Sequence, residues 1–129
     1  MKKITMILMA LVLTITGFSQ SVNKVSKSQY LVYEDGTWIT KISKRPDNMF
    51  VILDRNNVTV TNEARSRYVT YGEPEKATYE TFVCYTWSCV DSKGNDCSFL
   101  LKNFPDRSSV MIISYAAEGY AFEYFTDPN

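Results

Sequence analysis

The sequence predicts an all-β domain, an antiparallel meander of about eight or nine strands that forms a small barrel or sandwich behind an amino-terminal signal peptide. From residue 28 onward, short runs of β-branched and aromatic residues alternate with turn residues such as Gly, Pro, Asn and Asp. No stretch shows a convincing helical periodicity. The 129 residues are 45% hydrophobic and 14% aromatic, which is enough for one domain with one core.

The first predicted hairpin is centred on Asp35 and Gly36, because this dipeptide favours the tight turn that joins two antiparallel strands. Its strands are residues 29–34 and 37–43. In this register Tyr33 lies opposite Trp38, so we expect an aromatic cross-strand pair.

A second hairpin is expected after a loop at residues 44–48, where Pro46 interrupts the strand pattern. Residues 49–53 pair with residues 58–62 through a turn at residues 54–57. That turn contains two asparagines, and asparagine tolerates a positive φ angle better than most residues.

The rest of the chain is predicted as one short strand followed by two further hairpins. A break is expected at residues 72–75, because Gly72 and Pro74 both disrupt a ladder. Two further reversals are expected, one after Phe104 at Pro-Asp and one after Tyr115 at Ala-Ala-Glu-Gly. The strands are residues 67–71, 78–90, 97–102, 110–115 and 120–125.

The three cysteines of the chain lie close together in the sequence. Cys89 and Cys97 bracket a turn at residues 92–94, and a three-residue loop there places the two cysteines directly opposite each other. Opposed Cβ atoms lie close enough for a cross-strand disulfide. Cys84 is five positions from Cys89, an odd offset that sends it to the other face, so we expect it to be unpaired. The alternative is that all three thiols are buried and reduced.

The amino terminus has the order of a signal peptide, with Lys2 and Lys3, an apolar stretch over residues 4–15, and small residues at Gly17 and Ser19. Cleavage after Ser19 is therefore expected. The apolar stretch is shorter than the roughly 20 residues that span a bilayer. No later segment is long and apolar enough to cross a membrane, so none is expected after cleavage.

These observations divide the chain into a signal peptide at residues 1–19, a flexible polar lead at residues 20–27 and a single all-β domain at residues 28–129. Export places the domain in the periplasm, at the cell surface or outside the cell. Such compartments are oxidising, which favours the disulfide between Cys89 and Cys97.

The signal ends in Phe18-Ser19-Gln20 and is followed by a short, turn-rich β domain. This combination resembles the small exported proteins of Bacteroidota-type bacteria that have no assigned activity. The resemblance implies a periplasmic or surface location and transfers no site residues.

The composition excludes several functions. The chain has no histidine, which removes Ser-His and Cys-His nucleophiles and His-ligated zinc. The spacing of the three cysteines matches no zinc pattern, so neither a metal nor a cofactor is expected. Basic and acidic side chains are equal in number at 14 each, and removal of the signal takes away two lysines, which argues against nucleic acid as a partner.

Enzymatic activity is a less favoured hypothesis than binding. The remaining option is a pair of carboxylates acting as acid and base. Candidates are Glu73, Glu75 and Glu80 near one loop, or Asp91 and Asp96 across the cysteine turn. A His-free hydrolase is therefore the third hypothesis.

Aromatic side chains provide the favoured hypothesis for function, because Trp and Tyr combine a large contact area with a hydrogen bond. The first hypothesis is a non-enzymatic binding module or inhibitor that contacts an unknown protein or glycan through aromatic residues on a β surface. The alternative is a carrier of a small apolar ligand inside a β-barrel. Core packing is the competing explanation for the same side chains. The candidate binding residues are Tyr33, Trp38, Tyr79, Tyr85 and Trp87.

Overall fold

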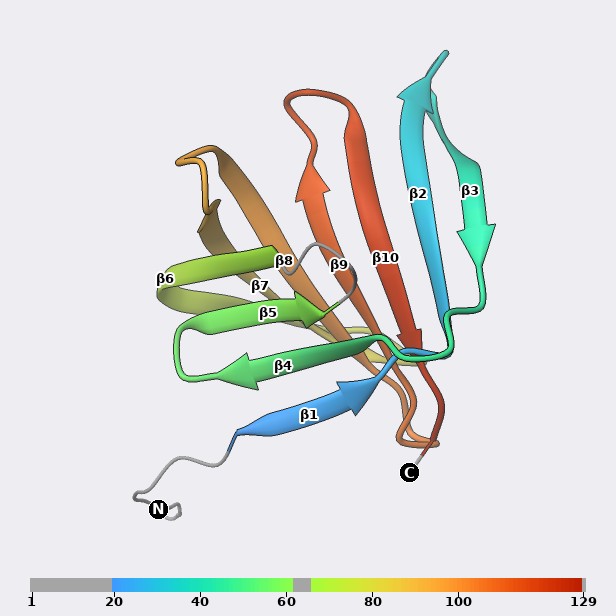
Figure 1. Ribbon diagram of the computed structural model, residues 1–129, viewed down its shortest axis with the longest axis vertical. Coiled ribbons are helices and arrows are strands. Elements are labelled where there is room, and N and C mark those ends of the chain that lie inside the picture. The colour runs from blue at the N-terminus through green and yellow to red at the C-terminus, as the bar shows by residue number, and fades with distance from the viewer. Residues whose placement is uncertain (1–19, 62–65, 129) are drawn as a thin grey trace.

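The computed structural model describes residues 20–61 and 66–128, and in these residues it is an all-β protein (Figure 1). The expected fold class is therefore confirmed. The expected signal peptide lies outside the described residues. The strands are β1 (Ser21–Lys24), β2 (Lys27–Glu34), β3 (Thr37–Lys44), β4 (Phe50–Asp54), β5 (Asn57–Thr61), β6 (Ser66–Thr78), β7 (Val83–Asp91), β8 (Asp96–Asn103), β9 (Ser109–Tyr115) and β10 (Tyr120–Thr126).

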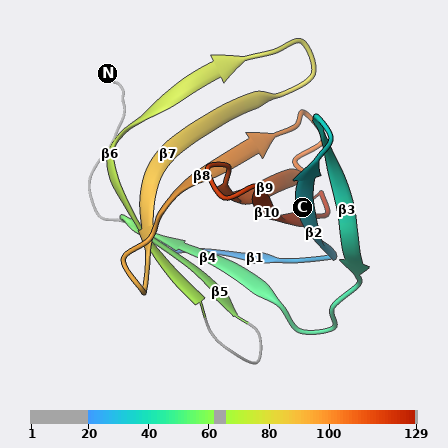
Figure 2. The same ribbon diagram turned by 90° about the horizontal axis from the view of Figure 1, so that it is seen from above.

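All ten strands belong to one antiparallel sheet with the order β1-β4-β5-β6-β7-β8-β9-β10-β2-β3. In the described part of the chain, no helix is long and apolar enough to cross a membrane. The sheet curls strongly. Figure 2 shows β1, β4 and β5 on the side of the curl opposite β7 and β8.

The curl is held by the junction between β1 and β2, which are consecutive in the chain but lie far apart in the sheet order. β1 pairs with β4, whereas β2 pairs with β10. At the junction, the Val25 amide donates to the Met49 carbonyl (2.9 Å) and the Ser26 amide donates to the Phe125 carbonyl (2.8 Å). One short stretch of chain thus ties both parts of the sheet together and gives a half-barrel.

This arrangement corrects the expectation that residues 20–27 form a flexible lead. Ser21–Lys24 form β1, and Lys27 already belongs to β2. The segment is polar, but its backbone is satisfied by the β4 ladder and Val25 is fully buried. Hydrogen bonding and one buried valine outweigh the polar composition.

The core lies inside the curl and follows the two-residue period of the strands. In β9, Met111, Ile113 and Tyr115 are buried and alternate with residues of the outer face. Val51 and Val60, on β4 and β5, close the core from the other side. The other buried members of this cluster are Val25, Val58, Tyr68, Cys89, Cys97, Phe99 and Tyr124.

The expected break at residues 72–75 is wrong, because β6 continues through it to Thr78. The ladder with β7 shifts register between Tyr71 and Glu75, so the Gly-Pro segment forms an irregularity within the strand. Gly72 has a φ of 77°, which allows the backbone to bend there. The real reversal follows at residues 79–82, where the Tyr79 amide donates to the Phe82 carbonyl (2.8 Å).

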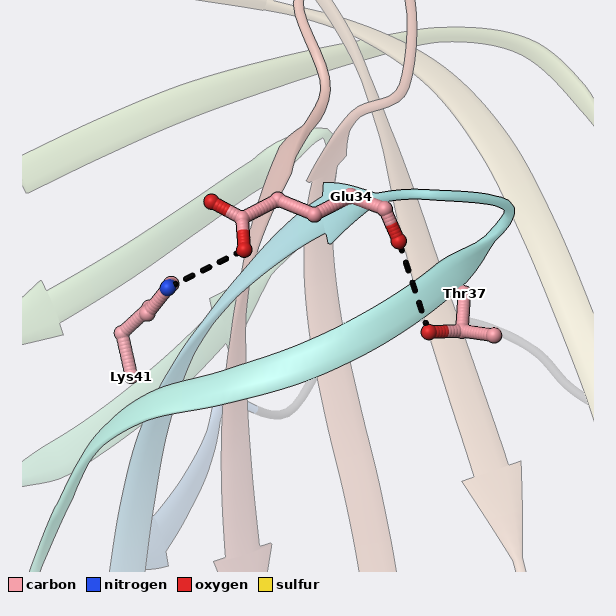
Figure 3. A network of polar contacts seen from close by, with 3 residues as sticks. All are labelled: Glu34, Thr37 and Lys41. Atoms are coloured by element: carbon pink, nitrogen blue, oxygen red, sulfur yellow. Dashed lines mark hydrogen bonds and ion pairs between the residues drawn. The ribbon is translucent and has the colours of Figure 1, made fainter.

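The β2–β3 hairpin forms as expected. Asp35 and Gly36 both have positive φ angles, 51° and 84°. Beside the turn, the Thr37 hydroxyl donates to the Glu34 carbonyl (3.5 Å), and Lys41 Nζ lies 3.1 Å from Glu34 Oε1 (Figure 3). In the second hairpin the positive φ falls on Arg55, at 56°, so the expectation of an asparagine in this conformation is wrong.

Candidate functional site

A cavity of about 490 Å³ lies between the β2–β3 hairpin, β10 and the beginning of β6. Its described lining is dominated by aromatic and aliphatic side chains, with a few hydroxyl groups and one lysine. The residues that matter most for its chemistry are Tyr30, Ile42, Lys44, Tyr68, Tyr120 and Phe122.

The aromatic wall of the cavity results from cross-strand pairing between β2 and β10. Phe122 lies opposite Tyr30, and Tyr120 and Tyr124 follow the same face of β10 at two-residue spacing. The ring centroids of Tyr30 and Phe122 are 5.3 Å apart, and those of Tyr120 and Phe122 are 5.9 Å apart. These distances are typical of favourable aromatic pairs, so the rings support one another.

Burial controls the protonation of the tyrosines at the cavity. It raises the pKa of Tyr68, although a hydrogen bond with Ser66 partly opposes the rise. Burial also raises the pKa values of Tyr120 and Tyr124. Their hydroxyl groups therefore stay protonated at neutral pH and can donate hydrogen bonds.

β3 supplies the open side of the cavity. Ile42 lies opposite Tyr30 and Lys44 lies opposite Ser28, so both side chains belong to the face that lines the cavity. Ile42 is 50% exposed although it is a large apolar residue. Lys44 is exposed at the end of the strand, which places its cationic group at the mouth.

The five aromatic residues expected to bind a partner lie in three separate places, and none of them lines this cavity. Tyr33 and Trp38 are opposed as expected, with ring centroids 5.3 Å apart, on the outer face of the β2–β3 hairpin. Tyr85 and Trp87 lie on the inner face of β7. Tyr79 is exposed in the turn after β6.

The inner aromatic residues of β7 belong largely to the packed interior. Trp87 stacks on Phe99 at 5.5 Å and packs against the core, while Tyr85 lies 6.1 Å from Trp87. Tyr79 stacks instead on Phe82, at 4.7 Å, because the turn removes it from the β7 face. The expected binding residues therefore do not form one continuous surface.

Sequence reasoning missed the residues that build the cavity. The run from Tyr120 to Tyr124 does contain a signal, because aromatic residues recur at every second position. Its partner Tyr30, however, is about ninety positions away in the chain. Only the pairing of β10 with β2 brings the two segments together.

The expected register of the cysteines is confirmed. Cys89 lies opposite Cys97, and their Sγ atoms are 3.0 Å apart, which is close but not a disulfide. Cys84 is buried on the opposite face of β7, as its odd offset predicts. The three thiols are reduced in this structure.

Asp91 is the most strongly hydrogen-bonded of the candidate carboxylates. The Tyr115 hydroxyl donates to its Oδ2 (2.7 Å), and the amides of Lys93 and Asn95 donate to its Oδ1 (2.9 Å each). These bonds, above all the one from Tyr115, lower the pKa of Asp91 to about 2. A group that is ionised at neutral pH and held by a turn is a structural anchor rather than a general acid.

The remaining candidate acids are dispersed. Glu73 and Glu75 are exposed on β6, and Glu80 is exposed in the turn that follows. Among residues 20–61 and 66–128, no three His, Cys, Asp or Glu side chains cluster in a way that could hold a metal ion.

The chain matches no protein-family model, no curated protein and no solved structure. Its own geometry is therefore the basis for assigning a function. In that geometry this cavity combines a concave shape, aromatic and aliphatic walls and several polar groups, which is the usual make-up of a small-molecule site.

Proposed function

We propose that this protein binds and carries a small apolar ligand in the cavity between β2, β3 and β10. The observation that carries the proposal is the half-exposed Ile42, which faces a cavity of about 490 Å³ walled by aromatic rings. This volume falls in the range of about 300–1,000 Å³ that small-molecule sites occupy. A ligand there would cover apolar surface that is otherwise exposed to water.

Two walls of the cavity are rigid before any ligand arrives. Tyr68 and Tyr124 are 7% and 8% exposed, and both belong to the main core cluster. Tyr30 packs against Phe122 and lies opposite it in a continuous ladder. A preformed site loses little conformational entropy on binding, which supports useful affinity for a small ligand.

A fluorescence titration with neutral N-phenyl-1-naphthylamine tests the proposal, because this probe brightens when it enters an apolar site. We expect saturable binding to the wild-type protein and clearly weaker binding to Ile42→Trp, whose larger side chain occupies part of the cavity. Thr40→Trp is the matched control, since Thr40 is exposed on the same strand and lies opposite Leu31, on the face away from the cavity. Absence of saturable binding to the wild type, or equal loss in both variants, would overturn the proposal.

A second candidate function is contact with a glycan through the outer face of the β2–β3 hairpin. Tyr33 and Trp38 are 50% and 42% exposed there, and their rings, inclined at 63° to each other, offer exposed aromatic surface on which sugar rings can pack. Trp87→Phe leaves Trp38 as the single tryptophan, so its emission then reports on this surface alone. A shift of that emission with soluble oligosaccharides supports the candidate, and an unchanged spectrum rejects it.

Export of the chain and a bond between Cys89 and Cys97 are further proposals, supported by the signal pattern and by the opposed thiols. In forming this bond, the two thiols transfer two protons and two electrons to a disulfide-containing oxidant, such as an oxidised thiol–disulfide oxidoreductase, whose own disulfide is reduced to two thiols. We expect the unreduced exported protein to begin at Gln20 and to weigh two hydrogens less than its reduced form. A full-length mass excludes cleavage, and an unchanged mass on reduction excludes the disulfide.

A further inference from the structure

The charge at the mouth of the cavity is unbalanced. Among the described residues that line it, Lys44 is the only lysine, arginine, aspartate or glutamate. No described carboxylate lines the cavity. Lys44 also makes no ion pair with any described residue.

A neighbouring lysine shows the contrast. Lys41, three positions earlier on β3, lies 3.1 Å from the carboxylate of Glu34, so a partner on the protein balances its charge. Lys44 lies opposite Ser28 on the face that lines the cavity, two residues beyond Ile42. The strand therefore presents an apolar side chain to the cavity and then a cation at its rim.

Hydroxyl donors surround the same site. Ser28 and Tyr30 lie on β2 opposite Lys44 and Ile42, and Tyr124 lies opposite Ser28 from the other side. Hydroxyl groups can donate hydrogen bonds and the ammonium group of Lys44 only donates them, so together they favour a negatively charged acceptor. A neutral acceptor could take the hydroxyl hydrogen bonds but would leave the positive charge of Lys44 without a counter-charge.

We infer that the ligand of this cavity is an anionic amphiphile, with an apolar or aromatic body against the tyrosines and Phe122 and one carboxylate, sulfonate or phosphate beside Lys44. This inference rests on the proposed carrier function and adds the chemical class of its ligand. The body provides most of the binding free energy through burial, and the lysine provides preference among ligands.

Two fluorescent probes that differ by one charged group test the inference. 1-Anilinonaphthalene-8-sulfonate has the same ring system as N-phenyl-1-naphthylamine and adds a single sulfonate. We expect the sulfonate to bind wild-type protein about fivefold more tightly at low ionic strength, the gain expected for a solvent-exposed charge pair. Added salt should reduce this preference, because it screens exposed charges.

Lys44→Met is expected to remove the preference for the sulfonate and to leave the affinity for the neutral probe unchanged. Lys41→Met is the matched control on the same strand and is expected to keep the preference. Equal affinities for the two probes in the wild type, or a preference that survives in Lys44→Met, would overturn the anionic ligand while leaving the carrier intact. If neither probe binds the wild type, the carrier function itself fails.

Discussion

At the residue scale, Asp91 connects the β7–β8 turn to the core. Its carboxylate accepts the amides of Lys93 and Asn95 within the turn and the hydroxyl of Tyr115 from β9. Tyr115 is buried and its ring stacks on Tyr120 at 4.8 Å, so its orientation is fixed by packing. The turn is thereby held against the same aromatic residues that continue into the cavity wall.

The low pKa of Asp91 predicts how stability depends on pH. Its value of about 2 lies below the reference value of 3.8, so its stabilising contribution is fully present above about pH 4 and is lost as the pH falls towards 2. We expect Asp91→Asn to lower the free energy of unfolding by about 1 kcal/mol at pH 7, since the carboxylate is solvent-screened. The difference from wild type should shrink between pH 4 and pH 2 in urea titrations.

Two further variants identify the cause of this effect. Tyr115→Phe removes the hydroxyl that donates to Asp91. The double variant with Asp91→Asn should therefore lose less free energy of unfolding than the sum of the two single losses. Asp47→Asn changes an exposed carboxylate in the loop before β4 and should have little effect on the free energy of unfolding at pH 7. The assignment of the pH effect to the Asp91–Tyr115 hydrogen bond would be contradicted by strictly additive losses for Asp91→Asn and Tyr115→Phe. A difference between Asp91→Asn and wild type that stays constant across the whole pH range would contradict it as well.

Residue pairs could be predicted from the sequence where one tight turn determines them. Tyr33 faces Trp38 across two turn residues, and Cys89 faces Cys97 across a short loop. The cavity could not be predicted in the same way, because Tyr30 and Phe122 are far apart in the chain and are brought together by the long-range pairing of β2 with β10. No local signal specifies a pairing between the first and last parts of a meander.

At the element scale, the β2–β3 hairpin is the wall of the cavity that has least support from the core. All eight residues of β3 are exposed, and its one described ladder partner is β2. Its shape therefore depends on the turn at Asp35 and Gly36. Gly36 has a φ of 84°, and a side chain there would meet no atom within 4 Å, so backbone strain alone decides the effect of a substitution.

Gly36→Ala is expected to lower the free energy of unfolding by about 1–2 kcal/mol, the cost of placing an L-residue in the left-handed region. Gly36→Asn should cost clearly less, because asparagine tolerates this conformation. Urea unfolding of the two variants measures the difference. Equal costs for the two variants would contradict the assignment of the effect to the φ angle.

The β6 strand shows why the boundaries of an element could not be predicted from the sequence. Gly and Pro are typical turn residues, yet Gly72 and Pro74 lie in an irregularity inside β6. The strand pairs with β7 both before and after this irregularity. The true reversal at residues 79–82 contains no glycine or proline. Tertiary pairing on both sides of the irregularity outweighs the local preference.

At the scale of the whole molecule, the β1–β2 junction decides whether the sheet stays curled. Val25 is fully buried there, its amide bonds to Met49, and the next residue bonds to Phe125. The junction therefore joins the β4 side of the sheet to the β10 side around one core. A substitution at this point should therefore destabilise the whole sheet and not one part of it, because neither part has a second hydrophobic layer of its own.

Val25→Ala tests this role of the junction. We expect the free energy of unfolding to fall by about 2 kcal/mol, from the methyl groups removed and the space they leave. Unfolding should remain one cooperative transition by both circular dichroism and tryptophan fluorescence, since Trp87 packs against the same core. Val22→Ala, a 58% exposed position on β1, is the matched control and should stay within about 0.5 kcal/mol of wild type. Two separated transitions in Val25→Ala would mean that the β1–β4–β5 side folds independently of the rest, and the cavity would then have to form without the curl.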